Sequence, residues 1–242
     1  MSYIVANQVK KIETLFIMGK KEECERLYQD LAEYIRRDEF TGRPRLAGNG
    51  KVQRRRNMFI ASIYRELGRH EMYVRRDFDA AIKHLGFSAL YREASVRASE
   101  RSYLLGKTRL ELAEALMRAG RAKEAREAAE KCFYNLIEPH RNIGEFLVYP
   151  ASKPLRYSEI AKYYYFMGDR EKAEELLGTM LDFPPCSFCR ETECYDRFLT
   201  LANILEMSGD IEQALKAYRR ALEISSTDAE LYVAIDTLEK LT

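Results

Sequence analysis

The chain has 242 residues, of which 46% are hydrophobic and 32% are charged, a composition typical of a folded, soluble and helix-rich protein. No apolar stretch approaches the roughly 18 residues that span a bilayer, and the N-terminus lacks the pattern of a signal peptide, so we expect a cytoplasmic protein with no membrane partner. The formal net charge is only +2, and the five cysteines are an odd number in a chain without a signal peptide, which argues against a disulfide framework.

A short motif recurs five times around a glycine, and it predicts the architecture of the chain. The copies are centred on Gly19, Gly68, Gly120, Gly168 and Gly209. Helices commonly end at a residue in the left-handed conformation, which glycine adopts without a side-chain penalty, so each copy predicts a helix, a turn and a second helix. We therefore expect an all-α fold, a single α-solenoid domain over residues 1–242 built from about five antiparallel helical hairpins.

Small side chains mark the places where the two helices of each hairpin meet. The hairpins are expected at about residues 2–38, 52–85, 100–137, 155–182 and 194–224. Antiparallel helices approach closely only where their facing side chains are small. Seven residues before the glycine stand Ala61, Ala113, Ala161 and Ala202, and five residues after it stand Ala125, Ala173 and Ala214.

The segment from Arg43 to Arg56, at the start of the second hairpin, is strongly basic. It contains six basic residues and no acidic residue: Arg43, Arg45, Lys51, Arg54, Arg55 and Arg56. Arginine forms paired hydrogen bonds with phosphates and carboxylates, so the segment is a candidate polyanion-binding site. The alternative is a solvated surface whose arginines pair with acidic residues elsewhere in the array.

Charge is unevenly distributed along the whole chain. Residues 42–109 hold 16 Lys and Arg against 6 Asp and Glu, so one third of the array is basic and its flanks are acidic. A basic region with tyrosines available for stacking is typical of nucleic-acid binders. Binding of RNA, DNA or another polyanion through the basic region 43–109 is therefore an alternative function.

Three cysteines cluster between the fourth and fifth hairpins, at Cys186, Cys189 and Cys194. Two cysteines separated by two residues can bind one metal ion, and zinc prefers four ligands in a tetrahedron. The fourth ligand is missing from the local sequence, and His140, Asp196 or a water are the candidates. Two interpretations stay open: a zinc site that makes the chain a metal-responsive or redox-responsive regulator, or a loop of reduced thiols.

The C-terminal end carries helix-start signals. Asp210 is placed to cap the second helix of the last hairpin. Thr227 and Glu230 have the spacing of a capping box, which predicts a last helix at about residues 228–241. Because no further hairpin follows, this helix is expected to cover the final repeat as a cap.

The last copy of the motif resembles the repeat of the tetratricopeptide repeat family. Small, turn, small, aromatic and small residues stand at the family's spacings: Ala202, Gly209, Ala214, Tyr218 and Ala221. The third and fourth copies match at the small and turn positions, and the first two match weakly. Successive glycines lie 41 to 52 residues apart, against about 34 in the family, so the array has longer helices or inserted loops.

The resemblance implies a concave groove lined by the first helix of each hairpin, at ten, six and three residues before the turn glycine. The candidate groove residues are Phe16, Met58, Arg65, Leu110, Met117, Lys162, Tyr165 and Asn203. Mixed apolar, aromatic and charged side chains suit a peptide partner. Family members that bind chaperone C-termini use Lys, Asn and Arg at the first two positions, where Glu13 and Glu114 of this chain oppose an anionic tail. We therefore predict that it is not such a carboxylate clamp.

The sequence favours a protein-binding or peptide-binding scaffold over an enzyme. There are only three histidines, and no paired motif places a base beside a nucleophile or a metal. We predict no catalytic residues, no small-molecule substrate and no cofactor other than the zinc alternative above.

Overall fold

The computed structural model describes residues 11, 20–37, 51–95, 102–138, 153–180, 194–226 and 228–242. Throughout these ranges helices are the only regular secondary structure. The predictions of an all-α fold and of a helical solenoid are confirmed.

The helices follow each other closely, joined in several places by short turns. Their bounds are α2 (Lys21–Arg37), α3 (Lys51–His70), the π-helical turn η1 (Glu71–Arg75), α4 (Phe78–Glu93), α5 (Tyr103–Arg118), α6 (Ala122–Glu130), the π-helical turn η2 (Phe133–Ile137), α7 (Lys153–Met167), α8 (Arg170–Thr179), α9 (Tyr195–Ser208), α10 (Ile211–Ile224) and α11 (Ala229–Glu239).

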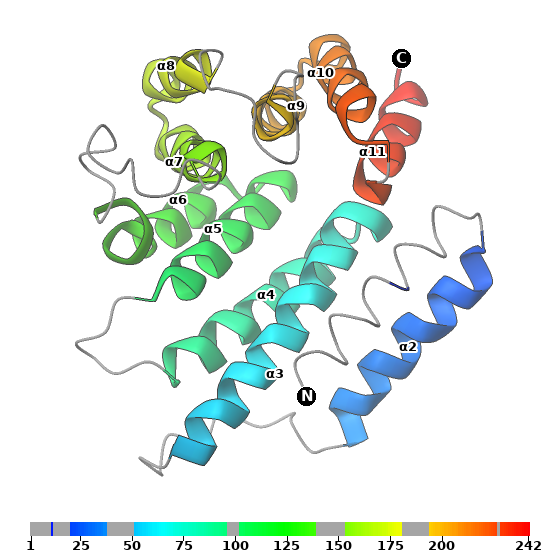
Figure 1. Ribbon diagram of the computed structural model, residues 1–242, viewed down its shortest axis with the longest axis vertical. Helices are drawn as coiled ribbons and strands as arrows, with labels where there is room; N and C mark the ends of the chain where they lie inside the picture. Colours follow the sequence, from blue (N-terminus) through cyan, green and yellow to red (C-terminus); the bar gives the residue numbers. More distant parts are fainter. Residues whose placement is uncertain are drawn as a thin grey trace.

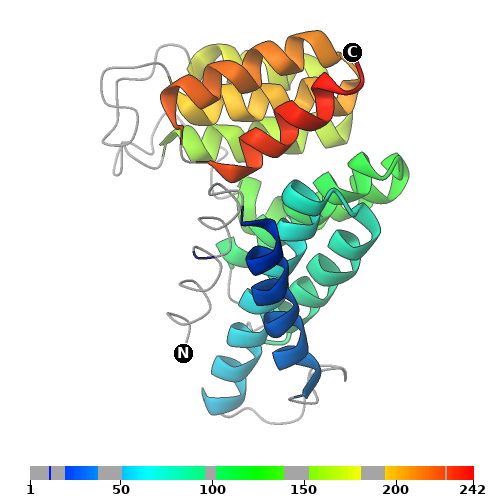
Figure 2. The ribbon, with the colours of Figure 1, turned by 90° about the vertical axis from the view of Figure 1, so that its right-hand side faces the viewer.

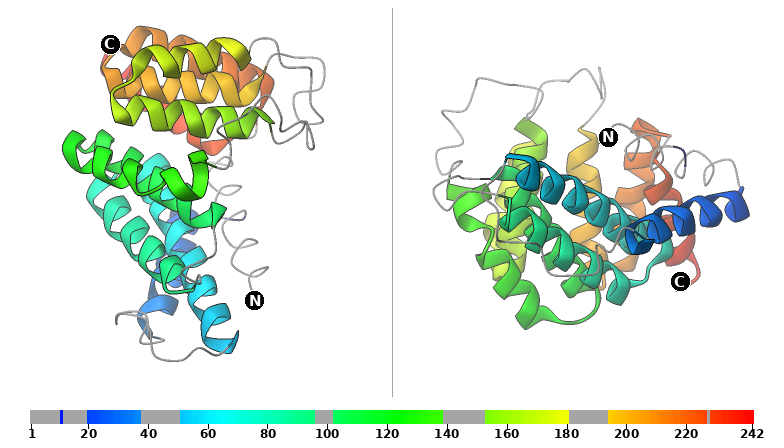
Figure 3. Two further views of the ribbon diagram at one scale, coloured as in Figure 1. Left: turned by 90° about the vertical axis from the view of Figure 1, so that its left-hand side faces the viewer. Right: turned by 90° about the horizontal axis from the view of Figure 1, so that it is seen from below.

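The helices pack as successive antiparallel pairs, α3 with α4, α5 with α6, α7 with α8 and α9 with α10 (Figure 1). The first helices of neighbouring pairs also contact each other, α5 against α7 and α7 against α9. Helices α7 to α11 form an upper tier that lies over α5 and over the C-terminal end of α3 (Figures 2 and 3). At the C-terminal end, α11 contacts both α10 and η1, so the end of the array returns to its second hairpin.

Three of the motif glycines end the first helix of a hairpin as predicted. Gly120, Gly168 and Gly209 have φ angles of 76°, 87° and 82°, the left-handed conformation that costs most residues free energy. A cap follows in the last hairpin, where the Asp210 side chain accepts a hydrogen bond from the backbone N–H of Gln213 at 3.3 Å. The predictions of these glycine turns and of the Asp210 cap are confirmed, while Gly19 lies outside the described residues.

The small residues lie where the helices approach most closely. The alanines seven residues before and five residues after these turns are at most 2% exposed, namely Ala113, Ala161, Ala202, Ala125, Ala173 and Ala214. Larger hydrophobic side chains fill the space around them and form a continuous core between α5, α6, α7 and α8. A side chain larger than alanine in these columns would force the helix axes apart.

The second hairpin does not turn at Gly68, contrary to the prediction. Gly68 lies inside α3, and the chain turns at Arg76, which has a φ angle of 58°. A Cβ atom built on Gly68 would lie 2.6 Å from Cγ of Leu85 in α4. Glycine is required at this position by the close approach of two helices, and the predicted hairpin 52–85 becomes α3, η1 and α4, which end at Glu93.

When positions are counted from the turn at Arg76, the second hairpin has the same pattern of capping and small residues as the other hairpins. Asp77 caps α4 by accepting a hydrogen bond from the backbone N–H of Ala80 at 3.0 Å, and Ala81 occupies the buried small position five residues after the turn. The π-helical turn η1 inserts an extra residue before Arg76. With that residue allowed for, Gly68 stands in the small column held elsewhere by Ala113, Ala161 and Ala202.

The last helix begins one residue later than the predicted capping box. The N-cap of α11 is Asp228, whose side chain accepts a hydrogen bond from the backbone N–H of Glu230 at 2.9 Å. Thr227 lies outside the described residues. One face of α11 is buried against α10 through Leu231, Ala234 and Leu238.

None of the helices in the described ranges combines the length and the apolar character that a membrane span needs.

Candidate functional site

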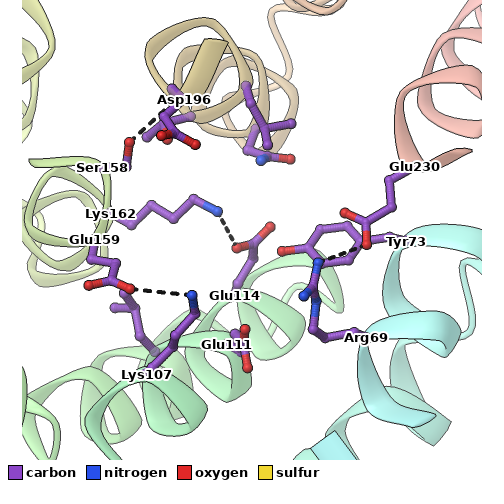
Figure 4. A pocket seen from close by; sticks show the side chains of 14 residues that line it. Arg69, Tyr73, Lys107, Glu111, Glu114, Ser158, Glu159, Lys162, Asp196 and Glu230 are labelled. Carbon is purple, nitrogen blue, oxygen red and sulfur yellow. Dashed lines mark hydrogen bonds and ion pairs between the residues drawn. The ribbon is translucent and has the colours of Figure 1, made fainter. Parts of the chain in front are cut away.

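A pocket of about 130 Å³ opens between the first helices of the hairpins. Charged side chains from α3, α5, α7, α9 and α11 line it and point toward one another (Figure 4). Helix α5 contributes Lys107, Leu110, Glu111 and Glu114, α7 contributes Ser158, Glu159 and Lys162, α9 contributes Asp196, Leu199, Thr200 and Asn203, and the remaining wall is formed by Arg69, Tyr73 and Glu230.

Three of the predicted groove residues lie on the pocket wall: Leu110, Lys162 and Asn203. They stand ten or six residues before a turn glycine, together with Glu114, Ser158 and Leu199. Successive first helices therefore present the same two positions of the repeat to one cavity. Whether these side chains bind a partner stays a prediction.

The other predicted groove residues lie elsewhere. Arg65 is behind the wall, where its guanidinium pairs with Glu111. Met117 and Tyr165 pack in the hydrophobic core, and the Tyr165 hydroxyl lies 3.0 Å from that of Ser208. Met58 is 46% exposed, whereas Phe16 lies outside the described residues.

The wall residues Arg69 and Tyr73 are not among the predicted groove residues, because the prediction places the turn of the second hairpin at Gly68 and so assigns the wrong residues to the groove positions. Counted from Arg76, Tyr73 stands three residues before the turn. Once the extra residue of η1 is allowed for, Arg69 stands at the position of Glu114. The Arg76-Asp77 pair, with Ala81 following at the small position, was the sequence signal for this register.

Glu114 is the central carboxylate of the α5 wall and is almost fully buried. Its Oε2 accepts a hydrogen bond from Nζ of Lys162 at 2.7 Å, and its Oε1 lies 3.2 Å from Nη2 of Arg118. Burial alone would raise the pKa of this carboxyl, but the charges of Lys162 and Arg118 outweigh burial and hold the pKa at about 2. Glu114 therefore remains ionised and keeps Lys162 in place.

Arg118 joins the α5 wall to α9. Its guanidinium donates to Oε2 of Glu206 at 2.7 Å and to Oδ1 of Asn203 at 2.6 Å, and it lies 5.8 Å from the centre of the Tyr73 ring. The same Asn203 oxygen accepts a hydrogen bond from the Tyr218 hydroxyl at 2.8 Å. These bonds fix the Asn203 amide, so its side chain meets the pocket in one orientation.

The opposite end of the α5 wall is also held by ion pairs. Nε of Arg65 donates to Oε2 of Glu111 at 2.6 Å. Burial alone would raise the pKa of the Glu111 carboxyl, but the charge and hydrogen bond of Arg65, together with the charges of Arg69 and Lys107, lower it. Nζ of Lys107 lies 3.5 Å from Oε1 of Glu159 on α7. Each carboxylate is thus paired with a cation from a neighbouring helix.

Two ion pairs tie the C-terminal helices to the second hairpin. Nη2 of Arg69 donates to Oε1 of Glu230 on α11 at 2.9 Å, and Arg76 at the turn pairs with Glu206 on α9. The Arg69 guanidinium also lies over the Tyr73 ring, 5.8 Å from its centre. These contacts close the array around the pocket, which is why α11 forms part of its wall.

Asp196, in the first turn of α9, differs from the other carboxylates of the pocket. Burial raises the pKa of its carboxyl, and the nearby charges of Lys107 and Lys162 offset only part of that effect. Its backbone carbonyl accepts a hydrogen bond from the Ser158 hydroxyl at 3.3 Å.

The basic region 43–109 is extensively paired where the structure describes it. Carboxylates of other elements, or of neighbouring turns, bind Arg65, Arg69, Arg75, Arg76 and Arg109. Of the predicted polyanion site, Arg43 and Arg45 lie outside the described residues. Lys51, Arg54, Arg55 and Arg56 lie in the first turns of α3, where the side chain is described only for Arg54, which is half-buried. Polyanion binding there stays a prediction.

The zinc hypothesis also stays a prediction. Cys186, Cys189 and His140 lie outside the described residues. Cys194 is the half-buried N-cap residue of α9, and no group of three metal-binding side chains occurs within the described ranges. Cys132 is a buried thiol of the core, and burial raises its pKa to about 12, so it stays protonated.

Comparison with known proteins identifies two repeats in the chain. Models of the tetratricopeptide repeat match residues 196–228, which span α9 and α10, and residues 107–131, which fall on α5 and α6. No curated protein matches the chain. The two matched segments contribute most of the pocket wall.

Proposed function

This chain is a tetratricopeptide repeat protein, and from that premise we propose that it is a non-catalytic interaction module that binds a peptide segment of a partner protein in the pocket between α5, α7 and α9. Repeats of this family generally form protein-interaction scaffolds.

The main support for this proposal is that hydrogen bonds fix the polar side chains of the pocket. Lys162 and Asn203 are each fixed by hydrogen bonds to Glu114 or Arg118, so they are ordered before a partner arrives. Side chains that are already ordered lose little conformational entropy on binding, which favours affinity. Leu110 and Leu199 lie among them and offer apolar surface. A small polar cavity with a few fixed groups is suited to a short peptide segment.

Selection from a displayed library of random peptides tests this function. We expect wild-type protein to enrich related sequences, and Leu199→Arg, which places a long charged side chain in the pocket, to weaken their binding by at least about tenfold. Leu104→Arg is the matched control, because Leu104 is 42% exposed on α5 and does not line the pocket. We expect it to bind as wild type does.

A second variant guards against a folding defect. Lys162→Ala removes a pocket cation and leaves Glu114 paired with Arg118, so we expect it to fold cooperatively, with a melting temperature below that of the wild type because one buried pair is lost. Peptides that bind wild type, Leu199→Arg and Lys162→Ala equally well would show that they bind elsewhere. A library that yields no related sequences would refute peptide binding.

A further inference from the structure

Within the part of the chain that the structure describes, Asp196 is the pocket carboxylate that has no bonded cation. Among the described residues, no side chain forms an ion pair or hydrogen bond with its carboxylate, which stands across the pocket from Lys107 and Glu111 (Figure 4). The hydrogen bond from Ser158 to its backbone carbonyl holds this turn of α9 against α7. The carboxylate therefore faces the cavity from a fixed position.

The other four carboxylates of the pocket each have a cationic partner. The pairs are Glu111 with Arg65, Glu114 with Lys162, Glu159 with Lys107, and Glu230 with Arg69. Glu114 has a second partner in Arg118. The charges of Lys107 and Lys162 act on Asp196 without a direct bond and offset only part of the cost of its burial. One further cation, bonded to Asp196, would complete the set of pairs.

The surroundings of Asp196 suit a cation carried on an apolar stem. Thr200 stands four residues later on α9, so its side chain lies on the same face of the helix as Asp196 and lines the same pocket. A threonine hydroxyl can accept a second hydrogen bond from a cation. Leu110 and Leu199 supply apolar wall for methylene groups. A cavity of about 130 Å³ accommodates one side chain and is too small for a helix.

We propose that the pocket receives a lysine side chain of the partner peptide, with its ammonium bound by the Asp196 carboxylate and the Thr200 hydroxyl. This inference rests on the proposed function and names the residue of the partner that enters the pocket. A lysine fits better than an arginine because its ammonium is compact, whereas the guanidinium needs planar space for its fork of donors.

An acidic group of the partner is the competing occupant, and the pocket disfavours it. The ammonium groups of Lys107 and Lys162 are the basic groups whose charges lower the pKa of Asp196, and both are already paired with carboxylates of the wall. An anion would have to break these pairs and would approach Asp196 and Glu114. The repulsion between its negative charge and these two carboxylates in a half-buried site would cost free energy.

Peptides selected by the wild-type protein provide the probe. We expect them to share a lysine, and replacement of that lysine by norleucine, which keeps the stem and removes the charge, to weaken binding by at least about tenfold. Replacement by arginine is expected to weaken it less than norleucine does. A shared acidic residue or a required free C-terminus, with affinity lost in Lys162→Ala, would establish the anionic occupant instead and overturn the proposal.

Asp196→Asn identifies the protein side of the contact. We expect this variant to bind the lysine peptide at least about tenfold more weakly, and to bind the norleucine peptide as wild type does, because both changes remove the same interaction. Asp236→Asn is the matched control, since Asp236 lies on the exposed face of α11. If Asp196→Asn and Asp236→Asn bind the lysine peptide equally, the assignment of Asp196 is wrong.

The two proposals fail in different ways. If Leu199→Arg abolishes binding but the lysine can be replaced without loss, the peptide site stands and the lysine proposal is refuted. If Leu199→Arg leaves binding of every selected peptide unchanged, the pocket is not the site, and both proposals are refuted.

Discussion

Single residues set the spacing of the helices, and Gly68 shows this most directly. It has an ordinary helical backbone, yet no other residue fits between α3 and Leu85 of α4. Gly86 in the middle of α4 offers a contrast, because a Cβ atom there meets nothing within 4 Å. Gly68 is therefore required by the packing of α3 on α4, whereas Gly86 can be replaced by alanine without a steric clash.

We expect Gly68→Ala to lower the free energy of unfolding by about 1–3 kcal/mol, because the new methyl group overpacks the contact between two helices. Gly86→Ala should raise it by roughly 0.5–1 kcal/mol through the better helix propensity of alanine. Urea unfolding followed by circular dichroism measures both. Equal stabilities of the two variants would contradict the close packing of α3 on α4.

We expect Glu71, at the start of η1, to make the docking of α2 dependent on pH. Its carboxylate accepts a hydrogen bond from Tyr28 of α2 and pairs with Arg75, and burial raises its pKa from 4.5 to about 7. The charge and hydrogen bonds of Arg75 lower this pKa in part, while the charges of Asp77 and Glu25 add to the rise. A raised pKa means that the folded state binds the proton more tightly than the unfolded state. The stability that this proton contributes is complete below about pH 4.5 and is lost as the pH rises through about 7.

Glu71→Gln tests this pH dependence, because glutamine still accepts the Tyr28 hydrogen bond but does not titrate. We expect the melting temperature of the wild type to fall between about pH 5 and about pH 8 by more than that of the variant. Parallel melting curves across this range would show that Glu71 does not titrate there.

At the level of helices, the buried arginine Arg118 joins elements that are distant in the sequence. It connects α5 to α9 through Glu206 and Asn203 and to η1 through the Tyr73 ring. Its side chain is only 3% exposed, so its charge relies on these partners. Arg126 on α6 is 59% exposed, and among the described residues its ion pair is with Glu130 of the same helix, at 3.6 Å.

We expect Arg118→Met to destabilise the fold by about 3 kcal/mol, because Glu114 and Glu206 lose a buried counter-charge. Arg126→Met, which removes an exposed pair, should change stability by less than about 1 kcal/mol. Chemical unfolding of the two variants gives the comparison. A loss for Arg118→Met no larger than that for Arg126→Met would show that this buried pair does not hold α5 to α9.

The order and type of the helices could be predicted from the sequence where glycine marks a turn. At Gly120, Gly168 and Gly209 the backbone requirement and the repeat coincide. At Gly68 they do not coincide. Glycine is required there for the close packing of two helices and not for a turn, and the extra residue of η1 moves the turn away from the spacing of the repeat. Local periodicity cannot distinguish these two uses of glycine, so two wall residues of the pocket were missed.

At the scale of the whole molecule, the array closes on itself. Arg69 and Glu230 are separated by 161 residues yet bond across the rim of the pocket. No local pattern in the sequence encodes this contact, because it depends on the small rotation between successive hairpins summed over the array. The pocket positions within each repeat could therefore be predicted, whereas the enclosure of the pocket by α11 could not.

Charge exchange tests the closure. We expect Glu230→Arg to repel Arg69 and to speed amide hydrogen exchange in α11 by about three- to tenfold. This increase corresponds to the free energy that a partly exposed ion pair contributes to stability. The double variant Arg69→Glu with Glu230→Arg restores the pair and should return exchange to the wild-type rate. If the single and double variants exchange alike, the ion pair does not hold α11 against the end of α3.

The most direct test of peptide binding in the pocket is a map of chemical-shift changes in methyl-labelled protein when a selected peptide is added. We expect the largest changes at the methyl groups of Leu110, Leu199 and Thr200, which line the pocket on α5 and α9. Methyl groups on the outer helices, such as Leu176 of α8 and Leu222 of α10, should change little. Chemical-shift changes concentrated on α8 and α10, with none at the pocket methyl groups, would contradict peptide binding in the pocket.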